Sequence, residues 1–157
     1  VAVLDLGESD AQEVADRIGY ERMSTWVDRF DYGNRNVGEE GATDRFWLEG
    51  PLEISALEQA TFVAELAREE LPVDVQHQRA LRDLLLVEEG PHHQHFGRTG
   101  LGVDVDPVPG WWVGWVEQGS DLHTFALRLE VEDQEDADLR ESLGRELLVA
   151  LDVLPAA

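Results

Sequence analysis

The sequence predicts an α+β domain in which an antiparallel sheet is flanked by helices. Apolar residues recur at helical spacing through much of residues 9–85, and the period becomes extended and alternating after Gly90-Pro91. Residues 139–154 return to helical spacing and are expected to cover the sheet. The 157 residues contain no repeat and no long linker, so we predict a single domain over residues 1–157.

Four helices are expected before the sheet. Ser9 with Gln12 and, more strongly, Ser55 with Glu58 have the form of capping boxes that open the first and third helices. Gly90-Pro91 is expected to end the fourth. The apolar face of each helix is, in chain order, Ala11, Val14, Ala15 and Ile18; Met23, Trp26, Val27 and Phe30; Leu57, Ala60, Val63, Ala64 and Ala67; and Ala80, Leu81, Leu84 and Leu85.

A sheet of about three strands is expected next, with Gln118-Gly119-Ser120-Asp121 as a hairpin turn. The strands are residues 92–99, 111–117 and 125–131. Such a sheet is thin for so many helices, and both of its flanks would be open edges. We therefore expect further polypeptide, either a preceding segment or a second copy of the chain as a homodimer, to complete it.

Composition excludes several classes of function. Acidic residues number 34 against 12 basic ones, a formal net charge of −22, which argues against binding to nucleic acid or to an anionic membrane. There is no cysteine, and all twelve basic residues are arginine, so a cysteine nucleophile or a lysine base cannot come from this chain. The excess of carboxylates without lysine favours adaptation to high salt, the alternative being an acidic protein of ordinary salt. No apolar run is long enough to span a bilayer, and no signal-peptide pattern opens the chain.

Generic catalytic patterns are incomplete. His92, His93 and His95 cluster, and the last two would share a strand face that could hold a divalent metal. Because no third ligand lies at a matching spacing, we predict no metal site and interpret the cluster as a partly exposed strand end. The serines include no G-x-S-x-G elbow, and the lack of lysine excludes an S-x-x-K pair.

A dense aromatic strand, Trp111 to Glu117, follows Gly97-Arg98-Thr99-Gly100 after a short loop. Its three tryptophans are the usual material of a core. A positive charge followed by Thr-Gly on the adjacent strand aligns backbone N–H groups, a hydroxyl and a cation. That combination suits an anionic carbonyl substrate.

Taken together, these motifs resemble the class D (OXA-type) serine β-lactamases of the penicillin-recognising superfamily. Gly97 to Gly100 stands where that class has its K-T-G strand, and the resemblance runs from about Gln12 onward, leaving residues 1–11 unmatched. The other matching segments are Tyr32-Gly33-Asn34 (Y-G-N), Phe46 to Gln59 (F-W-L-E-G…I-S…E-Q), Gly110 to Glu117 (G-W-W-V-G-W-V-E), Phe125-Ala126-Leu127 and Leu139-Arg140-Glu141-Ser142. The resemblance implies a β-lactamase/transpeptidase-like fold that lacks its N-terminal part.

The resemblance also implies acyl transfer, in which a serine attacks the β-lactam carbonyl and an N-carboxylated lysine serves as general base. No other cofactor is implied. Trp47 would hydrogen-bond the carbamate, and Leu101 would donate its backbone N–H to the oxyanion hole. The substrate-binding residues that the resemblance implies are Thr99, Gly100 and Arg140, with Thr99 and Arg140 binding the substrate carboxylate. Without the resemblance, Arg140 would be interpreted as a surface residue of an acidic helix.

Several positions depart from the family pattern. The S-x-x-K helix is absent from these 157 residues, and Leu6-Gly7-Glu8 stands where the S-x-V motif is expected. Arg98 replaces the lysine of K-T-G, which keeps the charge but not the capacity to donate a proton. We therefore expect the chain by itself to be inactive.

Three functions remain open from the sequence. The first is a class D β-lactamase represented by its C-terminal two-thirds, acting on a β-lactam and, like the family, periplasmic or secreted. The second is a non-hydrolysing β-lactam sensor that stays acylated, and the third is a catalytically dead structural remnant. Sensors tend to carry a polar residue at the position of Trp47, so this tryptophan favours the hydrolase.

Overall fold

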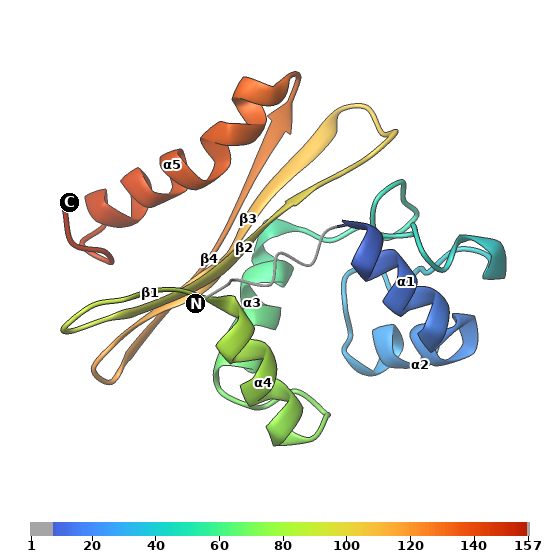
Figure 1. Ribbon diagram of the computed structural model, residues 1–157, viewed down its shortest axis with the longest axis horizontal. Coiled ribbons are helices and arrows are strands. Elements are labelled where there is room, and N and C mark those ends of the chain that lie inside the picture. Colours follow the sequence, from blue (N-terminus) through green and yellow to red (C-terminus); the bar gives the residue numbers. More distant parts are fainter. Residues whose placement is uncertain (1–7, 157) are drawn as a thin grey trace.

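The computed structural model describes the backbone of residues 8–156 and the side chains of residues 10–156. The predicted α+β class, with an antiparallel sheet flanked by helices, is confirmed (Figure 1). In chain order the elements are α1 (Glu8–Ile18), α2 (Tyr20–Arg29), the 3-10 helix η1 (Glu40–Ala42), α3 (Ala56–Ala67), α4 (Val75–Leu85), β1 (Leu86–Glu89), β2 (Gln94–Leu101), β3 (Val108–Gln118), β4 (Asp121–Val131) and α5 (Gln134–Ala150).

The sheet has four strands rather than the expected three, in the order β1-β2-β3-β4 with every pair antiparallel. The additional strand, β1, lies within the segment that the sequence assigns to the end of the fourth helix. Leu86 turns to an extended backbone directly after α4, and residues 86–89 then pair with β2. A run of four residues is too short for its periodicity to distinguish a strand from a helix. Pairing with β2 is what makes residues 86–89 a strand. The predicted turn at residues 118–121 is confirmed by the pairing of Gln118 with Asp121.

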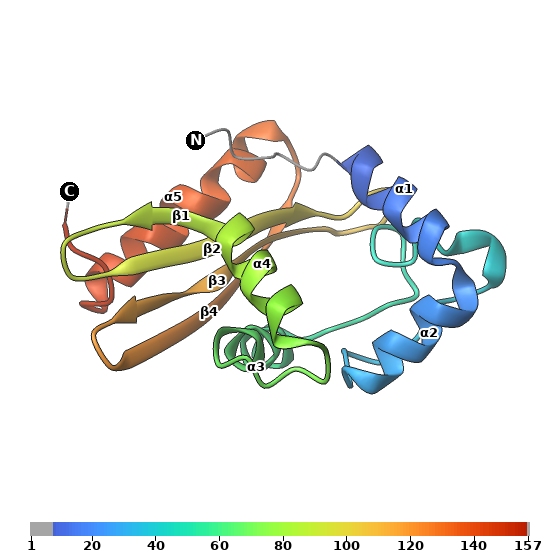
Figure 2. The same cartoon turned by 60° about the horizontal axis from the view of Figure 1, so that its bottom comes forward.

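Helices cover both faces of the sheet (Figures 1 and 2). On one face Phe96 and Trp115 stack at 4.7 Å and pack against α3. On the other face Trp112 and Val116 pack against Leu148 of α5. Because strand side chains alternate between the two faces, Trp112 and Trp115 of β3 lie in two separate cores. A third cluster joins α2 to the loop before α3.

The capping box of Ser55 and Glu58 is confirmed, with Ser55 Oγ accepting from the Glu58 backbone and the Glu58 carboxylate accepting from the Ser55 backbone. The capping box expected at Ser9 involves a side chain outside the described residues. No helix within residues 8–156 is long and apolar enough to cross a membrane.

The apolar helix faces expected from the sequence are in part wrong. On α1, Ala15 is buried, but Val14 is half exposed and Ile18 is 36% exposed. On α4 the buried residue is Gln78, whose amide bonds to the backbone of Leu71 and Val73. Leu81 and Leu84, which belong to the apolar face expected for this helix, are exposed.

The last helix departs furthest from expectation. The sequence predicts that Leu139, Leu143, Leu147, Leu151 and Leu154 cover the sheet. Of these Leu154 is buried, as expected, but the other four are exposed. The face against the sheet is instead Ala137, Gly144 and Leu148. A Cβ at position 144 would lie 2.1 Å from the Trp112 ring, so glycine is what allows the helix to approach β3. The small residues Ala137 and Gly144 of α5 thus decide which side of this helix faces the sheet.

Candidate active site

The candidate site lies at the end of β2 that β1 does not reach. β1 pairs only with residues 94–96 of β2, whereas β3 pairs with the whole strand as far as Leu101. Within residues 8–156, no strand pairs with the outer edge of β2 beyond Phe96. Alternate backbone N–H and C=O groups along residues 97–101 are therefore not used in strand pairing and can bond to an extended ligand.

Strand alternation sends the side chains of this segment to opposite faces of the sheet. Arg98 follows Phe96 on the α3 side, whereas Thr99 and Leu101 follow His95 on the α5 side. Arg98, Thr99 and Leu101 are exposed. The free backbone edge lies between the cation and the hydroxyl, so a ligand along it can contact both.

Arg140 of α5 reaches this strand. Its guanidinium donates a hydrogen bond to the carbonyl of Gly100, and its Nε donates to the carbonyl of Ala137 at 2.5 Å. The side chain is half-buried rather than extended into solvent. The structure therefore brings Arg140 to the Thr99-Gly100 segment, where only the resemblance had placed it.

The loop that carries Trp47 lies beside the same end of β2 (Figure 2). Phe46 and Leu48 are buried, and the half-buried Trp47 packs edge-on against Phe46 with ring centroids 5.0 Å apart. The backbone N–H of Val103, two residues after β2 ends, donates to the carbonyl of Leu48 at 3.0 Å. This hydrogen bond, which sequence reasoning missed, fixes the tryptophan loop to the strand.

Tyr32, Gly33 and Asn34 hold the far end of that loop. Asn34 Nδ2 donates to the carbonyl of Pro51 at 2.9 Å, and Asn34 Oδ1 accepts from the Glu53 backbone at 3.2 Å. Gly33 has φ +54°, and a Cβ there would lie 2.2 Å from the Glu53 carbonyl oxygen, so only glycine fits. These contacts make the motif a clamp on the loop.

The hydroxyl of Tyr32 donates to Gln59 Oε1 at 2.5 Å, which joins the clamp to α3. Burial raises the pKa of Tyr32, against the smaller lowering effect of this hydrogen bond. In the sequence Gln59 is only the last letter of a motif. Its structural role, accepting the hydrogen bond from Tyr32, becomes visible only in the fold. Tyr32 is therefore a neutral hydrogen-bond donor at ordinary pH.

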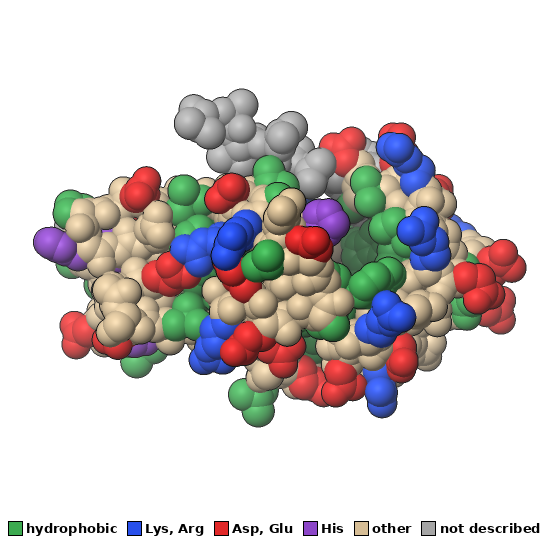
Figure 3. Space-filling model, turned by 90° about the horizontal axis from the view of Figure 1, so that it is seen from below, with side chains coloured by type: hydrophobic (Ala, Val, Ile, Leu, Met, Phe, Trp, Pro, Cys, Tyr) green, Lys and Arg blue, Asp and Glu red, His purple; other side chains and the backbone are tan. Residues whose placement is uncertain are grey.

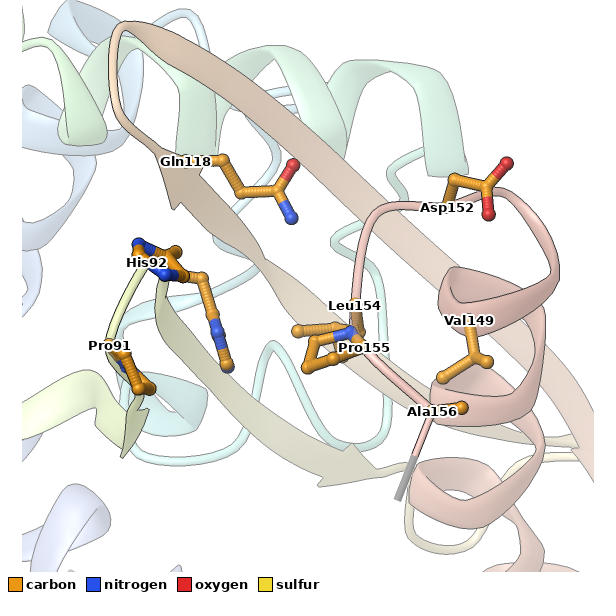
Figure 4. Close-up of a pocket in the computed structure, with 9 residues that line it drawn as sticks. Pro91, His92, Gln118, Val149, Asp152, Leu154, Pro155 and Ala156 are labelled. Carbon is orange, nitrogen blue, oxygen red and sulfur yellow. The ribbon is translucent and has the colours of Figure 1, made fainter.

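The histidine cluster lies away from this site. His93 is buried with Nε2 3.2 Å from Glu88 Oε1, and His95 is fully buried. Within the described residues, no group of three or more His, Cys, Asp or Glu side chains could hold a metal ion. His92 lines a cavity of about 420 Å³ with Pro91, Gln118 and Leu154 (Figure 4). This cavity lies where β2 begins and β3 ends, so it is distant from Trp47 and Leu101.

Comparison with known families gives one match over most of the chain. Residues 10–148 match the family described as the penicillin-binding protein transpeptidase domain. Among curated relatives, β-lactamase OXA-5 of Pseudomonas aeruginosa is 33% identical over 142 residues, covering 88% of this chain and 52% of the relative. β-Lactamase OXA-48 of Klebsiella pneumoniae is 35% identical over 144 residues, covering 92% and 54%.

Solved structures give the same picture. The class D β-lactamase YbXI from Nostoc superposes with a TM-score of 0.87 at 36% identity, covering 93% of this chain and 62% of that one. FUS-1 (OXA-85), a class D β-lactamase from Fusobacterium nucleatum, gives a TM-score of 0.87 at 32% identity, covering 93% and 61%. The chain thus spans about half the length of the curated relatives it matches.

Proposed function

Because this chain belongs to the penicillin-binding protein transpeptidase family and is similar to class D β-lactamases, we propose that it forms one wall of a β-lactam site. The reaction proposed is opening of the β-lactam amide through an acyl-enzyme. The observation that carries the proposal is the meeting of three segments at one end of the sheet. They are the open edge of β2, the loop of Trp47 and the start of α5 at Arg140.

The proposed substrate contacts follow from the charges at this edge. A β-lactam of the penicillin type presents a carboxylate beside its strained amide. Thr99 and Arg140 would bind that carboxylate, because a hydroxyl and a planar guanidinium suit its two oxygens. Arg140 already donates to the backbone of Gly100, so its remaining N–H groups are the ones available to a ligand. Arg98 adds positive charge from the other face of the strand.

Leu101 is proposed to act through its backbone. It is the last residue of β2, next to the unpaired edge, and its N–H would donate to the oxygen of the β-lactam carbonyl as negative charge develops there. A fixed backbone donor stabilises such charge without reorganisation during the reaction. The side chain of Leu101 has no proposed role in the chemistry.

The nucleophile is proposed to lie outside these 157 residues. None of them is lysine, so the chain cannot itself hold the N-carboxylated lysine that the family uses, nor a Ser-x-x-Lys pair. Figure 3 shows a hollow lined by apolar side chains between α4 and the α1–α2 pair. A segment bearing the serine and the lysine would occupy this hollow. The chain by itself would then bind a β-lactam weakly and not hydrolyse it.

No strand within residues 8–156 pairs with the outer edge of β4, and Leu139, Leu143 and Leu147 of α5 are exposed. Both observations support a requirement for further polypeptide. A preceding segment and a second copy of the chain are the two sources. Sedimentation of the purified chain distinguishes them, because only the second predicts a stable homodimer. By family analogy, we also propose that the protein acts in the periplasm or outside the cell.

A β-lactam sensor and a structural remnant are the competing proposals. Trp47 favours the hydrolase, because the sensors tend to carry a polar residue at this position. Intact mass spectrometry of the chain after incubation with benzylpenicillin in molar salt tests the assignment. We expect no adduct and no nitrocefin turnover. A stoichiometric adduct would mean that a serine of this chain is the nucleophile, and would support the sensor instead.

A chimera tests the wall itself. The N-terminal part of the Nostoc relative, fused ahead of this chain, would supply the missing nucleophile segment on a matching fold. We expect nitrocefin hydrolysis by the chimera and its loss on Arg140→Gln or Trp47→Ala. Arg22→Gln, at an exposed arginine that makes none of the proposed contacts, should leave hydrolysis unchanged. A folded chimera that neither hydrolyses nitrocefin nor forms an adduct would favour the structural remnant.

A further inference from the structure

His95 is a buried base that the proposed chemistry does not use. It is the second residue of β2 and is 1% exposed, and neither Nδ1 nor Nε2 has a hydrogen-bond partner among the described residues. The ring packs edge-on against Trp112 at 5.4 Å and tilted against Phe125 at 5.8 Å. A buried polar side chain without partners is costly, so its presence calls for an explanation.

The charged groups around His95 leave it no acceptor. Glu88 of β1 is bonded to both Arg145 of α5, at 2.7 Å, and His93 of β2, at 3.2 Å. From β3 and β4 the nearest side chains are aromatic or aliphatic, and His123 lies two strands away in register. Burial first, and then the charge of Arg145, lower the pKa of His95 to about 4. The imidazole is therefore neutral in the folded chain near neutral pH.

The face on which His95 lies is covered by α5. His95 shares this face with Trp112, whose ring lies directly under Gly144 of the helix. The residues of α5 that are buried against the sheet are Ala137, Gly144 and Leu148, whereas the row of leucines on this helix faces outward. The opposite face of the sheet carries the larger core of Phe96 and Trp115 under α3. An imidazolium at position 95 would reach water most easily by displacing α5.

We propose that His95 is an acid-sensitive latch, whose protonation releases α5 from the sheet while the α3 side of the fold stays closed. The neutral ring completes the apolar surface on which α5 packs. The charged ring is disfavoured there, because it has no hydrogen-bond partner and the nearby carboxylate of Glu88 is already bonded to Arg145 and His93. Release of α5 also removes Arg140 from Gly100. Acid would thus open the carboxylate-binding wall, a consequence that rests on the proposed function, whereas the latch itself does not.

Hydrogen exchange in constant molar salt tests the latch on the whole chain. Between about pH 7 and about pH 4, corrected for intrinsic exchange, we expect amides of α5 to open roughly a hundredfold more often, because the open state regains an ordinary histidine pKa. Amides of α3 should keep their protection. His95→Leu should keep α5 protected at acid pH. His92→Leu, which removes an exposed imidazole from the turn before β2, should behave like the parent chain.

Titration of the imidazole signals by NMR gives a second measurement that needs no variant. We expect His95 to titrate well below the ordinary histidine pKa of about 6.5, and together with the loss of α5 protection. Loss of protection in α3 and α5 at one pH would overturn the latch, since it would mean global unfolding. Titration of His95 near 6.5 with α5 still protected, or a folded His95→Leu chain that opens as the parent does, would overturn it equally.

Discussion

The guanidinium of Arg140 in α5 donates a hydrogen bond to the backbone carbonyl of Gly100 in β2, 40 residues earlier in the chain. The contact joins the only helix on that face of the sheet, within the described residues, to the strand of Arg98 and Thr99. Arg140 therefore anchors the helix and is also the arginine proposed to bind a substrate carboxylate. Its structural contribution can be measured without any substrate.

Arg140→Gln is expected to destabilise the chain by about 1–3 kcal/mol, the range for losing a hydrogen bond to a charged donor at a half-buried site. Urea unfolding at fixed molar salt, followed by circular dichroism, gives the free energy of unfolding. Arg22→Gln on the exposed side of α2 is the matched control and should change it by less than about 0.5 kcal/mol. Equal effects of the two changes would mean that the contact with Gly100 contributes nothing.

Gly33→Ala is expected to cost more than about 2 kcal/mol. The backbone there has φ +54°, and the new methyl group would meet the Glu53 carbonyl oxygen at 2.2 Å. Gly41→Ala is the control, because a Cβ at position 41 meets nothing within 4 Å. Thermal melts of both variants decide the matter, and a Gly33→Ala chain as stable as Gly41→Ala would contradict the clamp on the Trp47 loop.

Glu88→Gln is expected to weaken the acid sensitivity of folding. The hydrogen bond from Arg145 lowers the pKa of Glu88, so its ionised form adds stability above the ordinary glutamate pKa, and that stability is lost as pH falls through the lowered value. The variant should cost about 1 kcal/mol near neutral pH and converge on the parent chain in acid. Urea midpoints across this pH range give the answer, with the exposed Glu70→Gln as control. Parallel curves at all pH values would contradict it.

Removal of salt is expected to unfold the chain. A net charge of −22 on 157 residues produces strong self-repulsion, which counterions screen in molar salt. Dialysis into low salt should abolish the folded circular dichroism signal, and potassium chloride should restore it. Sucrose of equal osmolarity should not restore it, because it does not screen charge. Unchanged stability in low salt would indicate an acidic protein of ordinary salt.

Local chemistry made several features predictable. The capping box of Ser55 and Glu58 and the turn at residues 118–121 depend on side chains within a few positions of one another, and both are present. The motifs around Trp47, Arg98 and Arg140 indicated which segments form the candidate site. What they could not indicate is how the segments meet, since the hydrogen bonds from Val103 to Leu48 and from Arg140 to Gly100 join parts distant in sequence.

Burial was decided by the tertiary structure. A helical row of leucines shows that a helix has an apolar side, and Leu143 belongs to such a row on α5. The sheet nevertheless accepts the neighbouring Gly144, because the Trp112 ring leaves no room there for a side chain. By itself the sequence determined the fold class, the cap at Ser55, the turn and the motif segments, because these depend on neighbours along the chain. Which helix face is buried, and which residues meet across the sheet, depend on the shape of what lies opposite, so only the tertiary structure decided them.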